Sequence, residues 1–129
     1  MNLEEIDIFE KVHSQLEGLH SEISALSKKA QNDALNKFKL KYINQILAEA
    51  NKILGEKYKP FPDFDLFDDD LPNNSDVTFI VSQYLGCMEK LRADNIDYHE
   101  VFLGGKDTTA WYWKGTEQRT SPPMRIKEK

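Results

Sequence analysis

Residues 9–26 read FEKVHSQLEGLHSEISAL and place an apolar side chain at alternating steps of three and four residues. These side chains are Phe9, Val12, Leu16, Leu19, Ile23 and Leu26. An average step of about 3.5 residues is the period of a heptad seam, and it predicts one helix over residues 3–27. The seam packs either inside a helical bundle of one chain or against a second copy. For a homodimer, the dimer seam consists of Phe9, Val12, Leu16, Leu19 and Ile23.

A second helix is predicted over residues 33–55, because apolar residues again recur there at helical spacing. They are Leu35, Phe38, Tyr42, Ile43, Ile46, Leu47, Ala50, Ile53 and Leu54. Asn32 or Asp33 suits the N-cap of this helix, and Gly55 suits its C-terminal end.

The charge alternates along the chain. Residues 1–27 carry a net charge of −5, residues 28–59 carry +5, residues 60–91 carry −6 and residues 92–129 carry +1. The first two segments coincide with two helices of similar length and opposite charge. They predict an antiparallel helical hairpin with its turn near residues 28–32.

A third helix is predicted over residues 75–93, with Asn74 or Ser75 as its N-cap. The chain then changes period. Strand-like segments are YHEVFL at 98–103, TTAWYW at 108–113 and TEQRT at 116–120, and they are separated by the turn signals GG and KG.

The predicted fold is therefore mainly helical α+β. It combines an antiparallel helical hairpin, a third helix and a small C-terminal antiparallel β-hairpin or sheet. We expect a single domain over residues 1–129, with a small β element over 98–120 and a tail over 121–129.

The chain has 129 residues, a formal net charge of −5 and one cysteine, Cys87. A single cysteine excludes an internal disulfide and a zinc site built on cysteines. No apolar run approaches the roughly 20 residues that span a bilayer. The acidic start of the chain lacks the layout of a secretory signal. A pI near 5.2 makes nucleic acid an unlikely partner. We expect a cytoplasmic protein without a membrane, metal or cofactor requirement.

Residues 56–74, EKYKPFPDFDLFDDDLPNN, contain three prolines and alternate aromatic with acidic side chains. The prolines forbid a regular helix. The spacing of the acids does not match a calcium-binding EF-hand loop, because Phe67 falls where a ligand is needed. The pattern is typical of a segment that docks on a basic surface, either the Lys-rich second helix of this chain or a partner. The candidate partner-binding residues are Phe64, Asp65, Phe67, Asp68 and Asp69.

The segment TAWYWKGTEQR at 109–119 is the second candidate surface. Side chains alternate across a strand, so Trp111 and Trp113 share one face and Tyr112 takes the other. Aromatic side chains beside an arginine are typical of interface anchors. We therefore name Trp111, Trp113 and Arg119 as partner-binding candidates. The alternative is that both tryptophans belong to the core.

The segment RADNIDYH places Arg92 six residues before His99. This spacing resembles the Arg-x(4–6)-His signature of the HEPN ribonuclease superfamily, whose members are small, helical and commonly dimeric. The resemblance covers eight residues. It implies metal-independent cleavage of RNA, with Arg92 and His99 as catalytic candidates and Tyr98 in support. Ala93 departs from the polar residue that usually follows the arginine in that family.

We call residues 56–74 the acidic aromatic loop and residues 109–119 the aromatic hairpin. The preferred hypothesis is a small protein-binding accessory or regulatory protein that acts through these two surfaces. The alternative is the HEPN-like ribonuclease. A third hypothesis is a nucleic-acid regulator acting through the Lys-rich residues 28–59. The acidic first helix argues against the third, because it would neutralise that basic face if the two helices pack together.

Overall fold

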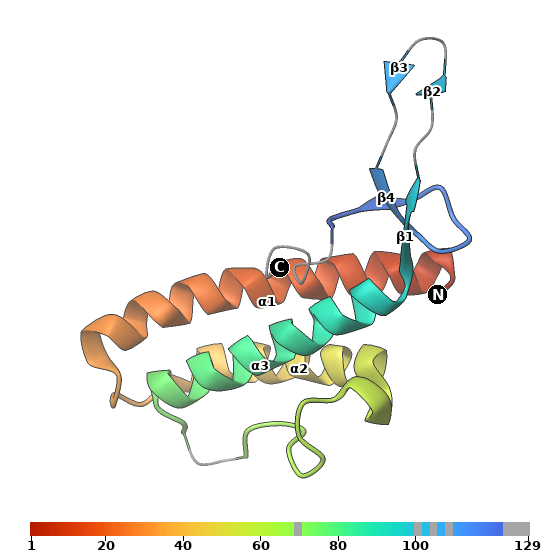
Figure 1. The fold of residues 1–129 in the computed structure, drawn as a ribbon. Coiled ribbons are helices and arrows are strands. Elements are labelled where there is room, and N and C mark those ends of the chain that lie inside the picture. The colour runs from red at the N-terminus through yellow and green to blue at the C-terminus, as the bar shows by residue number, and fades with distance from the viewer. Residues whose placement is uncertain (69–70, 100–101, 104–105, 108–109, 123–129) are drawn as a thin grey trace.

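A computed structural model describes residues 1–68, 71–99, 102–103, 106–107 and 110–122. It contains three helices. They are α1 (Leu3–Ala30), α2 (Lys37–Tyr58) and α3 (Asn74–Asp94). Figure 1 shows α2 and α3 lying side by side along α1, and both run in the direction opposite to α1. The predicted antiparallel hairpin and third helix are thus present.

Each helix begins at an asparagine that caps it. The side chains of Asn2, Asn36 and Asn73 accept a hydrogen bond from the backbone N–H three residues further on. At α1 the cap is reciprocal, because the carboxylate of Glu5 accepts from the backbone N–H of Asn2. The third helix is capped by Asn73 and not by the predicted Asn74 or Ser75, and the second is capped by Asn36 and not by the predicted Asn32 or Asp33. The second helix starts later because residues 31–34 form a turn that is tied to the start of α3.

That tie explains why residues 59–73 form such a long connection. Ala34 and Asn73 form an antiparallel bridge. The backbone N–H of Leu35 donates to the carbonyl of Pro72 at 2.8 Å, and the side chain of Asn74 donates to the carbonyl of Ala30 at 3.0 Å. These bonds fix the starts of α2 and α3 at the same end of the molecule. The chain must therefore travel the whole length of α2 between them.

The core lies between the three helices. Its largest buried side chains come from every helix and from the C-terminal sheet, and they include Phe9, Leu16, Ile23, Leu47, Tyr84 and Trp113. The expected dimer seam lies inside this core. Phe9, Val12, Leu16 and Ile23 are at most 2 % exposed, and Leu19 is partly buried against them. The seam is thus filled by α2 and α3 of the same chain, which corresponds to the intramolecular alternative.

Gly55 interrupts α2. It has φ +60°, a region that favours glycine, and one further helical turn follows it as far as Tyr58. The sequence predicts that the helix ends at this glycine. The glycine instead bends the helix, and the extra turn brings the Tyr58 hydroxyl within 2.7 Å of the carboxylate of Asp94 at the end of α3.

A small antiparallel sheet follows α3 in the order β1-β4-β5. Its strands are β1 (Ile96–His99), β4 (Ala110–Trp113) and β5 (Arg119–Thr120), and Ile96 pairs with Trp113. A second pair is formed by β2 (Phe102–Leu103) and β3 (Lys106–Asp107). The predicted single strand over 98–103 is thus divided between two ladders. In Figure 1 the sheet lies over the N-terminal half of α1, with β2 and β3 extending beyond it.

None of the helices in the described part of the chain is long and apolar enough to cross a membrane.

Candidate functional site

The acidic aromatic loop runs back along α2 and is held there by its backbone. The side chain of Asn44 donates to the carbonyl of Phe67 and accepts from the backbone N–H of Phe67, both at 3.0 Å. About two helical turns further along α2, the side chain of Asn51 donates to the carbonyl of Asp65 at 2.9 Å. The Tyr84 hydroxyl of α3 donates to the side-chain oxygen of the same Asn51 at 2.6 Å. Two amides of α2 therefore fix the course of the loop.

The aromatic side chains of the loop face the body of the molecule. Phe61, Phe64 and Phe67 are partly buried against the core. The Phe64 ring contacts Phe67 edge-to-face at 5.2 Å and Tyr84 at 6.3 Å. Burial is the main reason why the pKa of Tyr84 rises to about 12. Phe64 and Phe67 thus attach the loop to its own chain.

The acidic side chains of the loop differ in their contacts and exposure. Asp65 forms an ion pair with Lys59, whose side chain is nearly buried. Asp68 is exposed and lines a groove beside α2, and Asp69 lies outside the described residues. The loop lies along α2, as in the self-docking alternative, but the hydrogen bonds between them come from Asn44 and Asn51, and the Asp65–Lys59 ion pair lies within the loop.

In the aromatic hairpin, the two tryptophans have different surroundings. Trp113 is 1 % exposed and packs edge-to-face on Phe9 at 5.0 Å. It belongs to the core and not to an exposed binding surface, which corrects the expectation for this residue. Trp111 is half-buried beside Tyr98 at 5.2 Å. Arg119 is exposed and lies over the Tyr112 ring at 5.9 Å.

Arg92 is buried in a charged cluster between α1 and α3. It is 3 % exposed, and its two terminal nitrogens donate to Glu10 at 2.9 Å and to Glu89 at 3.0 Å. Glu89 also accepts from His13 Nε2 at 2.7 Å. The second oxygen of Glu10 accepts from Trp113 Nε1 at 3.3 Å and is 3.1 Å from the hydroxyl of Thr120. The cluster therefore joins the sheet to the helices.

The charges of the cluster change the pKa of Glu89. Burial by itself raises the pKa of this carboxyl, but the hydrogen bond from His13 and the positive charge of Arg92 outweigh burial and lower the pKa overall. The structure thus gives Arg92 two carboxylate partners. His99, the other catalytic candidate, ends β1 and pairs with Ala110 through the backbone register.

A third feature lies on the outer side of α2. The side chains of Phe38 and Tyr42 are 72 % and 44 % exposed, and their rings contact each other at 5.1 Å. Lys37 and Lys41 are exposed on the same helix, and the Lys41 ammonium lies 5.4 Å from the centre of the Tyr42 ring. We call these four residues the basic aromatic face.

A groove of about 360 Å³ adjoins the basic aromatic face. Lys37, Leu40 and Lys41 form the wall on α2, and Asn44 closes it. The opposite wall is the returning loop, with Phe67, Asp68 and Leu71. The hydrogen bonds between Asn44 and Phe67 hold the two walls together. The groove therefore combines the apolar side chains of Leu40, Phe67 and Leu71 with polar side chains from both walls.

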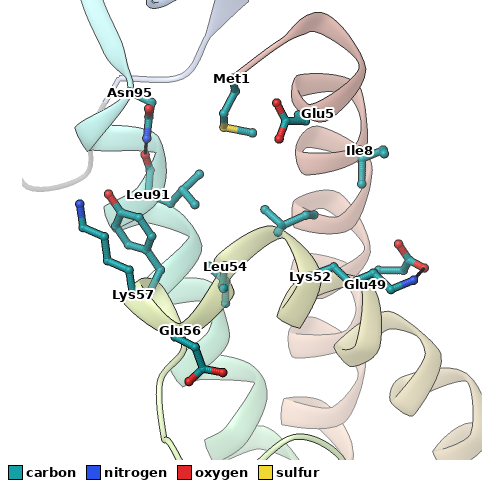
Figure 2. Close-up of a pocket in the computed structure, with 13 residues that line it drawn as sticks. Met1, Glu5, Ile8, Glu49, Lys52, Leu54, Glu56, Lys57, Leu91 and Asn95 are labelled. Carbon is teal, nitrogen blue, oxygen red and sulfur yellow. Dashed lines mark hydrogen bonds and ion pairs between the residues drawn. The ribbon is translucent and has the colours of Figure 1, made fainter.

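A second cavity, of about 480 Å³, lies at the other end of the three helices. Figure 2 shows Met1, Ile8, Leu54 and Leu91 around the same space. Charged residues of both signs surround it. They are Glu5, Glu49, Lys52, Glu56 and Lys57, and Glu49 is paired with Lys52 at 3.6 Å. The charge around this cavity does not select a ligand class.

The exposure of Phe38 and Tyr42 differs from the expectation, which counted both among the apolar residues of the second helix. The spacing of these residues in the sequence already indicates that they face away from the core. Both residues lie two positions from Leu40, which is about 200° around a helix, and Leu40 shares its side with Ile43 and Leu47. Among the described residues, no group of three or more His, Cys, Asp and Glu side chains is arranged to hold a metal ion.

Comparison with known proteins adds no relative, because no family model, curated protein or solved structure matches this chain.

Proposed function

We propose that this chain is a small accessory or regulatory protein that works by binding another protein through its basic aromatic face. The observation that carries the proposal is the exposure of Phe38 and Tyr42, at 72 % and 44 %, as a contacting pair in the middle of a charged helix. Fully burying an exposed Phe side chain stabilises a complex by up to about 1.5–3 kcal/mol, and the largest part of this gain is available at Phe38, which is the more exposed of the two.

The neighbourhood of the pair supports a protein partner. Exposed aromatic side chains that gather at one place, with polar residues around them, mark interaction sites more often than scattered apolar residues do. Lys37 and Lys41 of the same face also line the groove, which contains Leu71, a residue that is 38 % exposed. Aromatic anchors next to a preformed groove are the usual arrangement of an interface hot spot.

The acidic aromatic loop serves this proposal indirectly. Phe64 and Phe67 hold the loop against the chain, and the loop supplies one wall of the groove. We place the protein in the cytoplasm, because its single cysteine, Cys87, is partly buried and has no partner for a structural disulfide in the chain.

Affinity capture from the lysate of the organism that encodes the chain tests the proposal. Wild type is compared with the double variant Phe38→Ala/Tyr42→Ala. The control is Leu3→Ala/Tyr98→Ala, which removes two other exposed large side chains, 54 % and 50 % exposed, elsewhere on the molecule. We expect a stoichiometric protein partner that wild type and control retain and the Phe38/Tyr42 variant loses. The proposal is wrong if the variant retains every partner, or if only nucleic acid is recovered.

A further inference from the structure

We propose that the cavity at the bend of α2 binds a small, uncharged and largely apolar molecule. The proposal goes beyond the proposed function, because this cavity lies at the end of α2 and the basic aromatic face lies at its start. It depends on three features of the cavity: its apolar lining, the fixed turn that forms one side and the partners of its polar groups.

The apolar lining comes from all three helices. Met1 and Ile8 contribute from the start of α1, Ile53 and Leu54 from α2, and Leu91 from α3. Figure 2 shows Met1 and Ile8 on one side of the space and Leu91 on the other. Small-molecule sites are concave, mostly apolar and about 300–1,000 Å³ in volume. With about 480 Å³, this cavity has the size and the lining of such a site.

The turn after Gly55 forms one side of the cavity and is fixed at both ends. Gly55 and residues 56–58 line the space. The backbone N–H of Lys59 donates to the carbonyl of Gly55 at 3.1 Å, and the Tyr58 hydroxyl donates to Asp94 at the end of α3. A preformed site orders few groups when its ligand enters, which favours binding.

Most polar side chains around the cavity already have partners in the chain. Glu5 accepts from the backbone at the start of α1, and Glu49 is paired with Lys52. The Asn95 amide donates to a carbonyl of α3 at 2.8 Å, and the Lys57 ammonium lies 5.2 Å from the centre of the neighbouring tyrosine ring. A charged ligand would compete with these contacts, whereas an uncharged apolar molecule disturbs none of them. The ligand class thus follows from how the polar groups are paired, since their net charge does not select one.

Titration of the intact chain with N-phenyl-1-naphthylamine tests the proposal. This uncharged aromatic dye increases its emission in apolar surroundings. We expect saturable binding of one dye per chain, with an affinity that stays within twofold when NaCl rises from 50 to 300 mM, because no ligand charge is screened. The anionic dye 8-anilino-1-naphthalenesulfonate carries a sulfonate on a similar ring system and should bind at least fivefold more weakly.

Variants and NMR locate the binding site. Ile8 is 38 % exposed, so Ile8→Trp adds bulk at the mouth of the cavity without replacing a fully buried side chain, and it should weaken the neutral dye at least tenfold. The control Leu66→Trp adds the same side chain at a 44 % exposed position outside the cavity and should leave affinity within twofold. Circular dichroism checks that both variants remain helical. In wild type, intermolecular NOEs should connect the dye with the methyl groups of Leu54 and Leu91.

Several outcomes would overturn the proposal. They are the absence of saturable binding, equal effects of the two tryptophan variants, equal affinity for the two dyes, and NOEs to Phe38 and Tyr42 in place of the cavity residues. Self-association of the chain that excludes the dye would also overturn it, because a second copy would then occupy the cavity. Phe38→Ala/Tyr42→Ala should leave dye affinity within twofold, so the proposed function and this proposal are tested separately.

Discussion

The helices α2 and α3 lie side by side along α1. Each helps to hold one other part of the chain, α2 the acidic aromatic loop and α3 the C-terminal sheet, but the contacts differ in their chemistry. On α2, the neutral amides of Asn44 and Asn51 bind the backbone of the loop. On α3, the charged Arg92 and Glu89 join Glu10 of α1, which binds the sheet through Trp113. Both segments are fixed, but the sheet is attached through a buried charged cluster, whereas the hydrogen bonds from α2 to the loop come from neutral amides.

The difference has consequences for stability and for function. A buried charge that loses its partner is costly, whereas a lost amide hydrogen bond costs much less. On the outer side of α2, Phe38 and Tyr42 are 72 % and 44 % exposed in the part of the chain that the structure describes. We interpret the charged and amide attachments as scaffold and the outer side of α2 as the binding surface.

Removing the central cation should give the largest effect. Arg92→Met leaves Glu89 and Glu10 without their common partner, and we expect a loss of about 3 kcal/mol in the free energy of unfolding. The estimate takes the low end for a broken buried pair, because the Glu10 side chain is 39 % exposed. Urea denaturation measures it. Lys90→Met, on the same helix but exposed, should cost less than about 0.5 kcal/mol, and equal losses for both variants would refute the distinction.

Acid should weaken the attachment of the sheet. Because the pKa of Glu89 is lowered in the folded state, its carboxylate contributes stability above its unfolded pKa of about 4.3. That contribution is lost as the pH falls through the lower folded pKa. Wild type should therefore be more stable than Glu89→Gln at pH 7, and the gap should close in acid. Urea midpoints between pH 7 and pH 3 measure the gap, and a gap that stays constant contradicts the account.

The amide attachment of the loop should be weaker. Asn44→Ala removes two hydrogen bonds to Phe67, and we expect a loss of about 1–2 kcal/mol in the free energy of unfolding. Faster hydrogen exchange at the Phe67 amide, measured by NMR, should accompany it. Gln45→Ala, on the exposed side of the same helix, is the control and should leave that exchange unchanged. Unchanged exchange in Asn44→Ala would show that the Asn44 amide does not hold the loop and that its other contacts, the Asn51 hydrogen bond and the aromatic packing, do.

The outer side of α2 should give the smallest effect on stability. Phe38→Ala/Tyr42→Ala removes little buried surface and places good helix formers in α2, so the free energy of unfolding should change by less than about 0.5 kcal/mol. Thermal denaturation followed by circular dichroism measures it. A large loss would mean that the two rings stabilise the fold and would remove the main support for a binding role.

The helices and the sheet could be predicted from the sequence because their signals are local. The heptad spacing around Leu16 identified α1, and the change of period after residue 95 identified the sheet. Helix starts were less certain, because several asparagines compete for each cap. The tertiary bridge between Ala34 and Asn73, with the hydrogen bonds around it, fixes where α2 and α3 begin.

The inward or outward orientation of aromatic residues could not be predicted in the same way. Strand alternation places Trp111 and Trp113 on one face, but contact with Phe9 and Glu10 buries Trp113 while Trp111 stays half-buried. In α2, the apolar residues extend around most of the helix. Which of them face the core depends on how α1 and α3 pack, and this information is not local in the sequence.

The most direct test of the central claim is site-specific photo-cross-linking in the host cell. A benzophenone amino acid is placed at position 38 of the basic aromatic face and, in a second strain, at position 98 of β1, where Tyr98 is 50 % exposed. The account predicts a cross-linked protein from position 38 that is weakened in the Tyr42→Ala background. A cross-link from position 98 alone, or one from position 38 that Tyr42→Ala leaves unchanged, would contradict it.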